Sequence, residues 1–148
     1  MQLTPKETSL LKDLGDQEKL CVEKYAKHAE CAKDPQLKDL FYQISDSERK
    51  HQDAIDQLKS GTVAAPFQPG ASKTFSACYN MTENDDKKND CFLCSDLLAA
   101  EKHASHLYDT CIFEFTDDSA RTLLNSIQKA EQGHGKAIYD YMSANSMY

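Results

Sequence analysis

The chain has 148 residues, of which 40% are hydrophobic and 28% charged, a composition typical of one soluble globular domain spanning 1–148. No apolar run approaches the roughly 18 residues of a membrane span, and the polar start Met1–Glu7 lacks the apolar region of a signal peptide. We therefore expect synthesis in the cytoplasm and no membrane partner. The 24 acidic residues exceed the 17 basic ones and give a net charge of −7, which disfavours nucleic acid as a partner.

Two helices are predicted in the first part of the chain, at about 5–32 and 34–60. Thr4, Pro5 and Glu7 form the pattern of a capping box with proline at the first helical position. Asp34-Pro35 repeats the cap and the proline, and Gly61 ends the second helix. The connection between the two helices is short, so they are expected to be antiparallel neighbours.

Residues 61–89 contain Gly61, Pro66, Pro69 and Gly70 and show no helical period. Two further helices are predicted at about 90–116 and 118–144. A long connection inside a small domain is unusual, but a four-helix bundle with one long crossover requires one that returns along the bundle. The predicted fold is therefore all-α: an antiparallel four-helix bundle with the crossover between the second and third helices.

The two halves of the sequence match when one is shifted by 83 residues, without a gap from residue 10 to residue 60. The shift places Glu18 on Glu101 and Tyr25 on Tyr108. The match indicates a duplicated helix pair related by a pseudo-two-fold axis.

Six charged or ligating residues fall on the apolar stripes of the four predicted helices. They are Glu18, Glu48, His51, Glu101, Glu131 and His134. Buried carboxylates are costly unless they are paired or bound to metal. One glutamate from each of two helices and a Glu-x-x-His from each of the other two form a dinuclear carboxylate site.

The set therefore predicts two metal ions, with iron first and manganese or zinc as alternatives. Two divalent cations would change the formal net charge from −7 to −3. The other interpretations of the same residues are an ancestral ligand set that binds nothing and a buried polar layer held by hydrogen bonds.

At these six residues the chain resembles the ferritin-like superfamily, whose members hold a di-iron or di-manganese centre, and the resemblance covers essentially the whole chain. It implies a ferritin-like fold in which Glu18 and His51 bind one metal and Glu101 and His134 the other. Glu48 and Glu131 would bridge the two ions.

The second half, with Leu97–His103, Ile138–Met142 and Met147-Tyr148, resembles CotF-like spore coat proteins of clostridial endospore formers. Asp16–Cys21 and Asp34–Phe41 are similar to the amino-terminal half of such proteins. This resemblance implies a location in the spore coat, with other coat proteins or further copies of the chain as partners.

Three functions follow as hypotheses. The first is a CotF-like coat protein with a dinuclear, di-iron site. The second is a rubrerythrin-like or ferroxidase-like di-iron oxidoreductase that reacts with O₂ or peroxide, takes electrons from an external donor and uses Tyr25 as an assisting residue. The third is a structural assembly protein in which the metal only joins the helices or the site is vestigial.

Two local features remain open between function and packing. Gly133 and Gly135 flank His134 and are unfavourable inside a helix, so they either make room for a small oxidant or allow a close helix approach. Cys91 and Cys94 form a lone C-x-x-C at the predicted start of the third helix, where the helix amino terminus would lower the thiol pKa.

Overall fold

A computed structural model describes residues 1–148 and contains four α-helices and no strand. The helices are α1 (Pro5–Cys31), α2 (Pro35–Lys59), α3 (Asp85–Glu114) and α4 (Asp118–Ala144). The all-α class is confirmed, and the predicted bounds of α1, α2 and α4 hold to within a residue or two. Membership of the ferritin-like fold stays a prediction.

The amino termini of α1 and α2 form as the sequence indicates, and α4 begins with the same kind of cap. The Thr4 side chain accepts a hydrogen bond from the Glu7 amide at 3.1 Å, and the Glu7 carboxylate accepts one from the Thr4 amide at 2.9 Å. Asp34 and Asp117 cap α2 and α4 by accepting from backbone amides of the first turn. At the other end of α2, Gly61 takes the left-handed backbone conformation, with φ 86°, that commonly follows a helix.

The predicted start of the third helix is wrong by five residues, because α3 begins at Asp85 rather than near residue 90. Asn84 caps it by accepting from the Lys87 amide at 2.8 Å, and Asp85 and Asp86 lie in its first turn. Acidic residues are favourable at a helix amino terminus, so the polar stretch that indicates a loop by hydropathy is the helix start.

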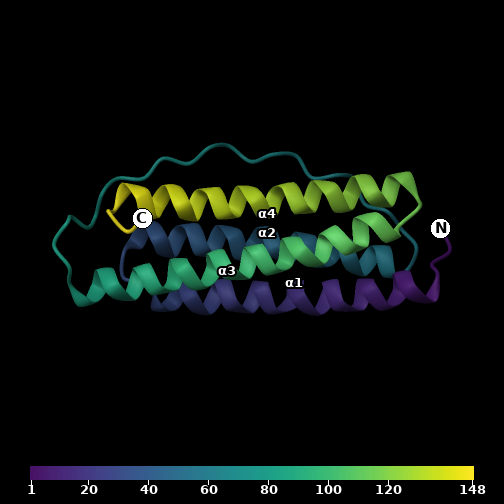
Figure 1. Cartoon of the computed structure of the whole chain (residues 1–148), viewed down its shortest axis with the longest axis horizontal. Helices are drawn as coiled ribbons and strands as arrows, with labels where there is room; N and C mark the ends of the chain where they lie inside the picture. Colours follow the sequence, from purple (N-terminus) through teal and green to yellow (C-terminus); the bar gives the residue numbers. More distant parts are fainter.

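The chain runs up α1 and down α2, returns along the outside of the bundle, and then runs down α3 and up α4 (Figure 1). The turn within each helix pair is short, whereas residues 60–84, here called the crossover segment, pass along the length of the bundle (Figure 1). α2 and α4 approach each other least closely among the adjacent helix pairs. The crossover segment contacts both of these helices and covers the seam between them.

Hydrogen bonds fix the crossover segment to both helices that line the seam. Phe67 donates its amide to Ser126 Oγ of α4 at 3.0 Å, and the Ser76 amide donates to Gln36 Oε1 of α2 at 2.9 Å. Farther along, the Tyr79 hydroxyl donates to the buried Asp90 at 2.7 Å. The long connection is therefore an ordered part of the fold.

Two apolar clusters fill the interior, one toward each end of the bundle. The first contains Tyr25, Ala29, Ala32, Leu37, Leu40, Phe41, Ile44, Leu93, Cys94, Leu97, Ile138, Tyr141 and Met142. The second contains Leu11, Leu14, Ala54, Ile55, Leu58, Tyr108, Cys111, Phe115, Ala120, Leu123, Leu124 and Ile127. The break between the clusters lies at mid-bundle, where the stripes carry polar residues.

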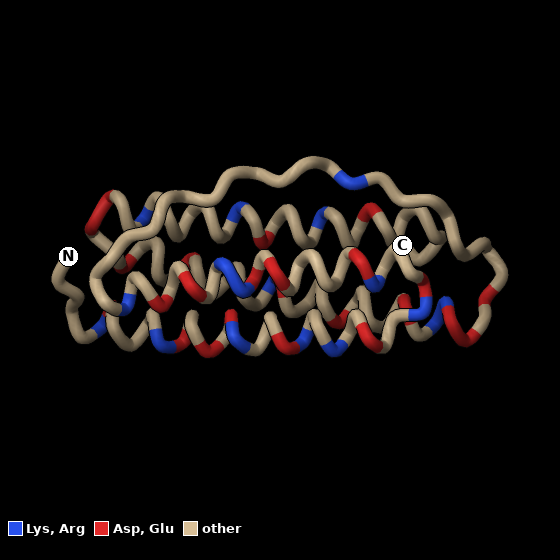
Figure 2. The backbone as a smooth tube through the Cα atoms, turned by 180° about the vertical axis from the view of Figure 1, so that it is seen from behind, with Lys and Arg blue, Asp and Glu red and all other residues tan.

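Charges of both signs alternate along the outer faces of the helices, and no large basic surface forms (Figure 2). Between residues 60 and 82 the crossover segment carries a single charged residue, Lys73. No helix is both long enough and apolar enough to cross a membrane.

Candidate metal centre

The helical register brings all six predicted ligands together in the middle of the bundle. α1 and α3 each contribute one glutamate, and α2 and α4 each contribute a glutamate and a histidine. These residues are Glu18, Glu48, His51, Glu101, Glu131 and His134. The four glutamates and His51 are almost completely buried, while the His134 side chain keeps 12% of its surface exposed.

The six side chains form two overlapping groups, each with four ligand atoms within 4.8 Å of one another. The His51 group consists of Glu18, Glu48, His51 and Glu131. The His134 group consists of Glu48, Glu101, Glu131 and His134. Glu48 and Glu131 belong to both groups, so the two histidines and the two remaining glutamates separate into one pair on each side.

In the His134 group, the Nδ1 atom of His134 lies 2.8 Å from Glu48 Oε1 and 3.3 Å from Glu101 Oε1. In the His51 group, Nδ1 of His51 lies 3.3 Å from Glu131 Oε1 and 3.5 Å from Glu48 Oε2. Both imidazoles therefore present the same nitrogen to the carboxylates. The two rings stack at 22° with centroids 5.8 Å apart.

The buried side-chain nitrogen and oxygen atoms without a hydrogen-bond partner all belong to these six residues. They are Oε2 of Glu18 and Glu101, both carboxylate oxygens of Glu48 and Glu131, and Nδ1 of His51 and His134. Buried polar groups in proteins are normally satisfied, and an unsatisfied one costs about 1–3 kcal/mol. Oxygen and imidazole nitrogen atoms that converge in this way are able to hold metal ions.

The electrostatics of the metal-free cluster follow from crowding four carboxylates in a buried layer. Burial, then the charge of Glu48, raises the pKa of Glu18 well above its ordinary value. Burial and the neighbouring Glu101 raise the pKa of Glu131 in the same way. Without a cation, these two carboxyl groups therefore hold protons in a pH range where exposed glutamates are ionised.

Glu48 and His134 take the complementary charges. Burial raises the pKa of Glu48, but the close approach of Glu18 and the two histidines outweighs burial and holds it well below the ordinary value. Burial lowers the pKa of His134, but its contacts with Glu101 and Glu48 raise it to about 10. The metal-free site is therefore described by an ionised Glu48 beside a protonated His134.

Each half of the repeat hydrogen-bonds the single glutamate of the other half through a buried tyrosine. The Tyr25 hydroxyl donates to Glu101 Oε1 at 2.6 Å, and the Tyr108 hydroxyl donates to Glu18 Oε1 at 2.6 Å. The sequence places Tyr25 on the same face as Glu18, but its partner lies in the other helix pair. The two tyrosines are equivalent in the fold, so no observation singles out Tyr25.

Two outer residues of the site have no sequence signal. Ser47 Oγ lies 3.1 Å from Nε2 of His134. Phe67 of the crossover segment packs edge-on against the His51 ring, with centroids 4.8 Å apart. Ser47 reaches its partner across the α2–α4 seam and Phe67 lies in a non-periodic loop, so neither contact follows from helical spacing.

The two glycines beside His134 do not serve a close helix approach. A Cβ atom added to Gly133 would meet no atom within 4 Å, and one added to Gly135 would meet only Leu98 Cδ2 at 3.8 Å. The packing explanation is therefore wrong at both positions. The alternative, that the glycines leave room for a small oxidant, stays a prediction.

Cys91 and Cys94 lie away from the helix amino terminus, since α3 begins at Asp85. The helix dipole acts only within the first turn, so, contrary to the prediction, it does not reach these two thiols. Cys94 is buried, and burial raises the pKa of its thiol. Neither cysteine belongs to a group of potential metal ligands.

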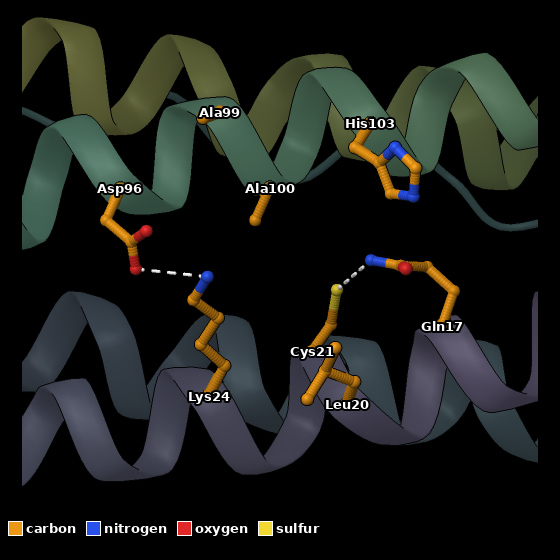
Figure 3. A pocket seen from close by; sticks show the side chains of 8 residues that line it. All are labelled: Gln17, Leu20, Cys21, Lys24, Asp96, Ala99, Ala100 and His103. Carbon is orange, nitrogen blue, oxygen red and sulfur yellow. Dashed lines mark hydrogen bonds and ion pairs between the residues drawn. The ribbon is translucent and has the colours of Figure 1, made fainter.

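A surface groove of about 320 Å³ lies between α1 and α3, next to the buried carboxylate layer (Figure 3). Lys24 and Asp96 form an ion pair across it at 3.1 Å, and Gln17 donates to the sulfur of Cys21 at 3.3 Å. Burial, then the charges of Glu48, Glu18 and Glu101, raises the pKa of Cys21. The Cys21 side chain therefore lines the groove, and its thiol lies close enough to the buried carboxylates for their charges to raise its pKa.

Comparison with known families gives one match, to the Coat F domain, at residues 89–148. The carboxy-terminal part of the chain resembles a Coat F domain. This matched region contains most of α3 and all of α4, with Glu101, Glu131 and His134. It supports the resemblance to CotF-like spore coat proteins for the second half of the sequence. No curated protein and no solved structure matches the chain.

Proposed function

We propose that the protein is a CotF-like spore coat protein of ferritin-like fold that carries a dinuclear metal centre. One observation supports the metal centre: the residues with unsatisfied buried side-chain atoms are the same residues that the sequence predicts as ligands. The Coat F match at residues 89–148 supports the coat assignment and a location in the spore coat, with other coat proteins or further copies as partners.

In this proposal the His51 group and the His134 group each hold one divalent cation, and Glu48 and Glu131 are shared between them. Four carboxylates balance the charge of two such cations, which removes the conflict of a crowded acidic layer. Iron is the first candidate, and manganese and zinc have the same preference for oxygen and imidazole donors. Iron would supply one-electron redox chemistry when bound.

The chain's own residues prepare the site in three ways. The apolar clusters on both sides exclude water from the carboxylate layer. Tyr25 and Tyr108 fix one oxygen each of Glu101 and Glu18, and the other oxygen of each carboxylate has no hydrogen-bond partner. Ser47 holds the ring of His134 through its outer nitrogen.

Two alternative functions use the same residues. In a di-iron oxidoreductase of the rubrerythrin or ferroxidase kind, the groove beside Cys21 would offer a route for a small oxidant, and an external donor would supply electrons. In a structural protein, the metal would join all four helices, because every helix contributes at least one ligand. Binding would then be part of the folding free energy.

The first test is the metal content of protein loaded anaerobically with Fe(II), followed by the optical spectrum after O₂ or peroxide is added. Two iron ions per chain and oxidation of the iron support a redox centre. Two iron ions without oxidation support a structural site. No stoichiometric metal, with Mn(II) and Zn(II) tried as well, would overturn the proposed centre. The matched control is Glu23→Gln, an exposed glutamate of α1, which should bind as wild type.

The coat assignment is tested separately in sporulating cells. The protein is expected in the coat extract of purified spores, detected by an antibody against the chain. Its absence from spores would overturn that assignment and leave the metal result intact.

A further inference from the structure

Different contacts hold the two histidines of the centre, although the two residues occupy equivalent positions in the repeat. Both rings turn Nδ1 toward the carboxylates. The outer nitrogen of His134 meets Ser47 Oγ at 3.1 Å, the kind of outer hydrogen bond that usually orients a histidine ligand. His51 has no hydrogen bond at its outer nitrogen; instead the edge of Phe67 packs against its ring at 76°.

Phe67 reaches His51 because the crossover segment covers the α2–α4 seam at this point. Its backbone amide is fixed by Ser126 Oγ of α4, and its ring meets His51 of α2. Val63 and Ala64 of the same segment pack on the neighbouring apolar cluster. The segment is thus attached to both walls of the seam directly above His51.

The result is an asymmetry in exposure between the two halves of the centre. The His51 side chain is 1% exposed and that of His134 is 12% exposed. Glu18 of the His51 group is also more buried than Glu101 of the His134 group. The His51 side of the centre is therefore covered more completely than the His134 side.

We propose that Phe67 is a positioning residue for His51 and that the crossover segment controls metal exchange at the His51 group. This inference rests on the proposed metal centre and adds the order in which its two ions exchange. The His134 group exchanges its ion first. The His51 group exchanges only when residues 63–67 move away from the seam.

The test uses the full chain with Co²⁺ as the probe and follows the optical spectrum as excess EDTA removes the ion. Wild type should release two ions in two kinetic phases. Phe67→Ala should accelerate the slow phase about tenfold, since an aromatic contact of this type contributes on that order, and leave the fast phase unchanged. Ser47→Ala should instead accelerate the fast phase.

Phe75→Ala is the matched control, because Phe75 belongs to the same segment but packs against Tyr141, away from the centre. It should leave both phases as in wild type. Equal release kinetics in the Phe67 and Phe75 variants would overturn the inference. Circular dichroism checks folding, and Phe67→Leu replaces the alanine variant if that variant does not fold.

A second readout separates this inference from the metal centre itself. Deuterium exchange at the imidazole carbon between the two nitrogens is measured on metal-free protein by mass spectrometry. Phe67→Ala should raise the exchange rate of His51 alone, with Phe75→Ala as the control. If wild type binds no Co²⁺ the proposed centre fails, and the exchange rate of His51 then decides whether Phe67 covers it. An unchanged exchange rate of His51 in Phe67→Ala would overturn the inference that Phe67 covers this histidine.

Discussion

The hydroxyl of Tyr25 in α1 donates a 2.6 Å hydrogen bond to Glu101 in α3, the glutamate of the other helix pair. Tyr108 and Glu18 form the reciprocal bond at the same length. The two bonds join α1 and α3 twice across the centre. They also explain why one oxygen of each single glutamate is satisfied while the other is not.

Tyr25→Phe and Tyr108→Phe are expected to have matching effects, because the two bonds are related by the repeat. Each should lower the free energy of unfolding of the metal-free protein by about 1–3 kcal/mol, since a buried carboxyl loses its donor. Urea unfolding measures the change. Tyr139→Phe, at a partly exposed tyrosine, is the control. A large effect in only one of the two variants would contradict the equivalence.

The metal-free protein is expected to lose stability as the pH rises from about 6.5 toward 10. The pKa of His134 is raised from 6.5 to about 10 in the folded state, so its contribution is complete below 6.5 and is lost as the pH passes 10. The raised pKa values of Glu18 and Glu131 act in the same direction, because the unfolded chain releases those protons more readily. Urea titrations with a chelator present measure the slope. Stability that rises over this range would contradict the prediction.

Metal should reverse this pH dependence, because the ligands bind it in their deprotonated forms. At a free metal concentration of one hundred times the Kd, the gain is about 2.7 kcal/mol. Thermal melts with and without a chelator at pH 6 and pH 8 test this. The metal-induced increase in Tm should be larger at pH 8.

Glu131→Gln is expected to abolish binding of both ions, because Glu131 belongs to both groups. In the metal-free protein at pH 8 the same variant should be as stable as wild type or more stable, since a neutral amide replaces a carboxyl group that burial and Glu101 already keep from ionising. Equilibrium dialysis and urea unfolding measure the two effects. A Glu131→Gln variant that binds two ions normally would show that the ligand set is wrong.

Asp90→Ala tests the attachment of the crossover segment independently of the centre. Its carboxylate accepts from the amides of Lys33 and Asp34 at 2.8 and 3.0 Å and from the Tyr79 hydroxyl at 2.7 Å. Removing it leaves one buried and two partly buried donors without a partner, so the free energy of unfolding should fall by about 3 kcal/mol. Asp86→Ala, exposed in the first turn of the same helix, should change it by less than about 1 kcal/mol.

The number of helices, the caps at Thr4 and Asp34, and the six candidate ligands follow from the sequence alone. These features are local or periodic. A cap involves a few consecutive residues, and a buried stripe follows from 3.6 residues per turn. The gapless shift of 83 residues then indicated which positions of the two halves correspond. The start of α3 was missed because an acidic first turn has the composition of a loop.

Which residues of different helices meet depends on how the helices pack in three dimensions. Helical spacing places Tyr25 on a face but does not say that its hydroxyl reaches Glu101 rather than Glu18. Likewise, Phe67 lies in a segment without a period, so its contact with His51 depends on the path of the crossover over the α2–α4 seam. Contacts between distant segments depend on how elements pack together, and that information is not contained in the spacing within any one element.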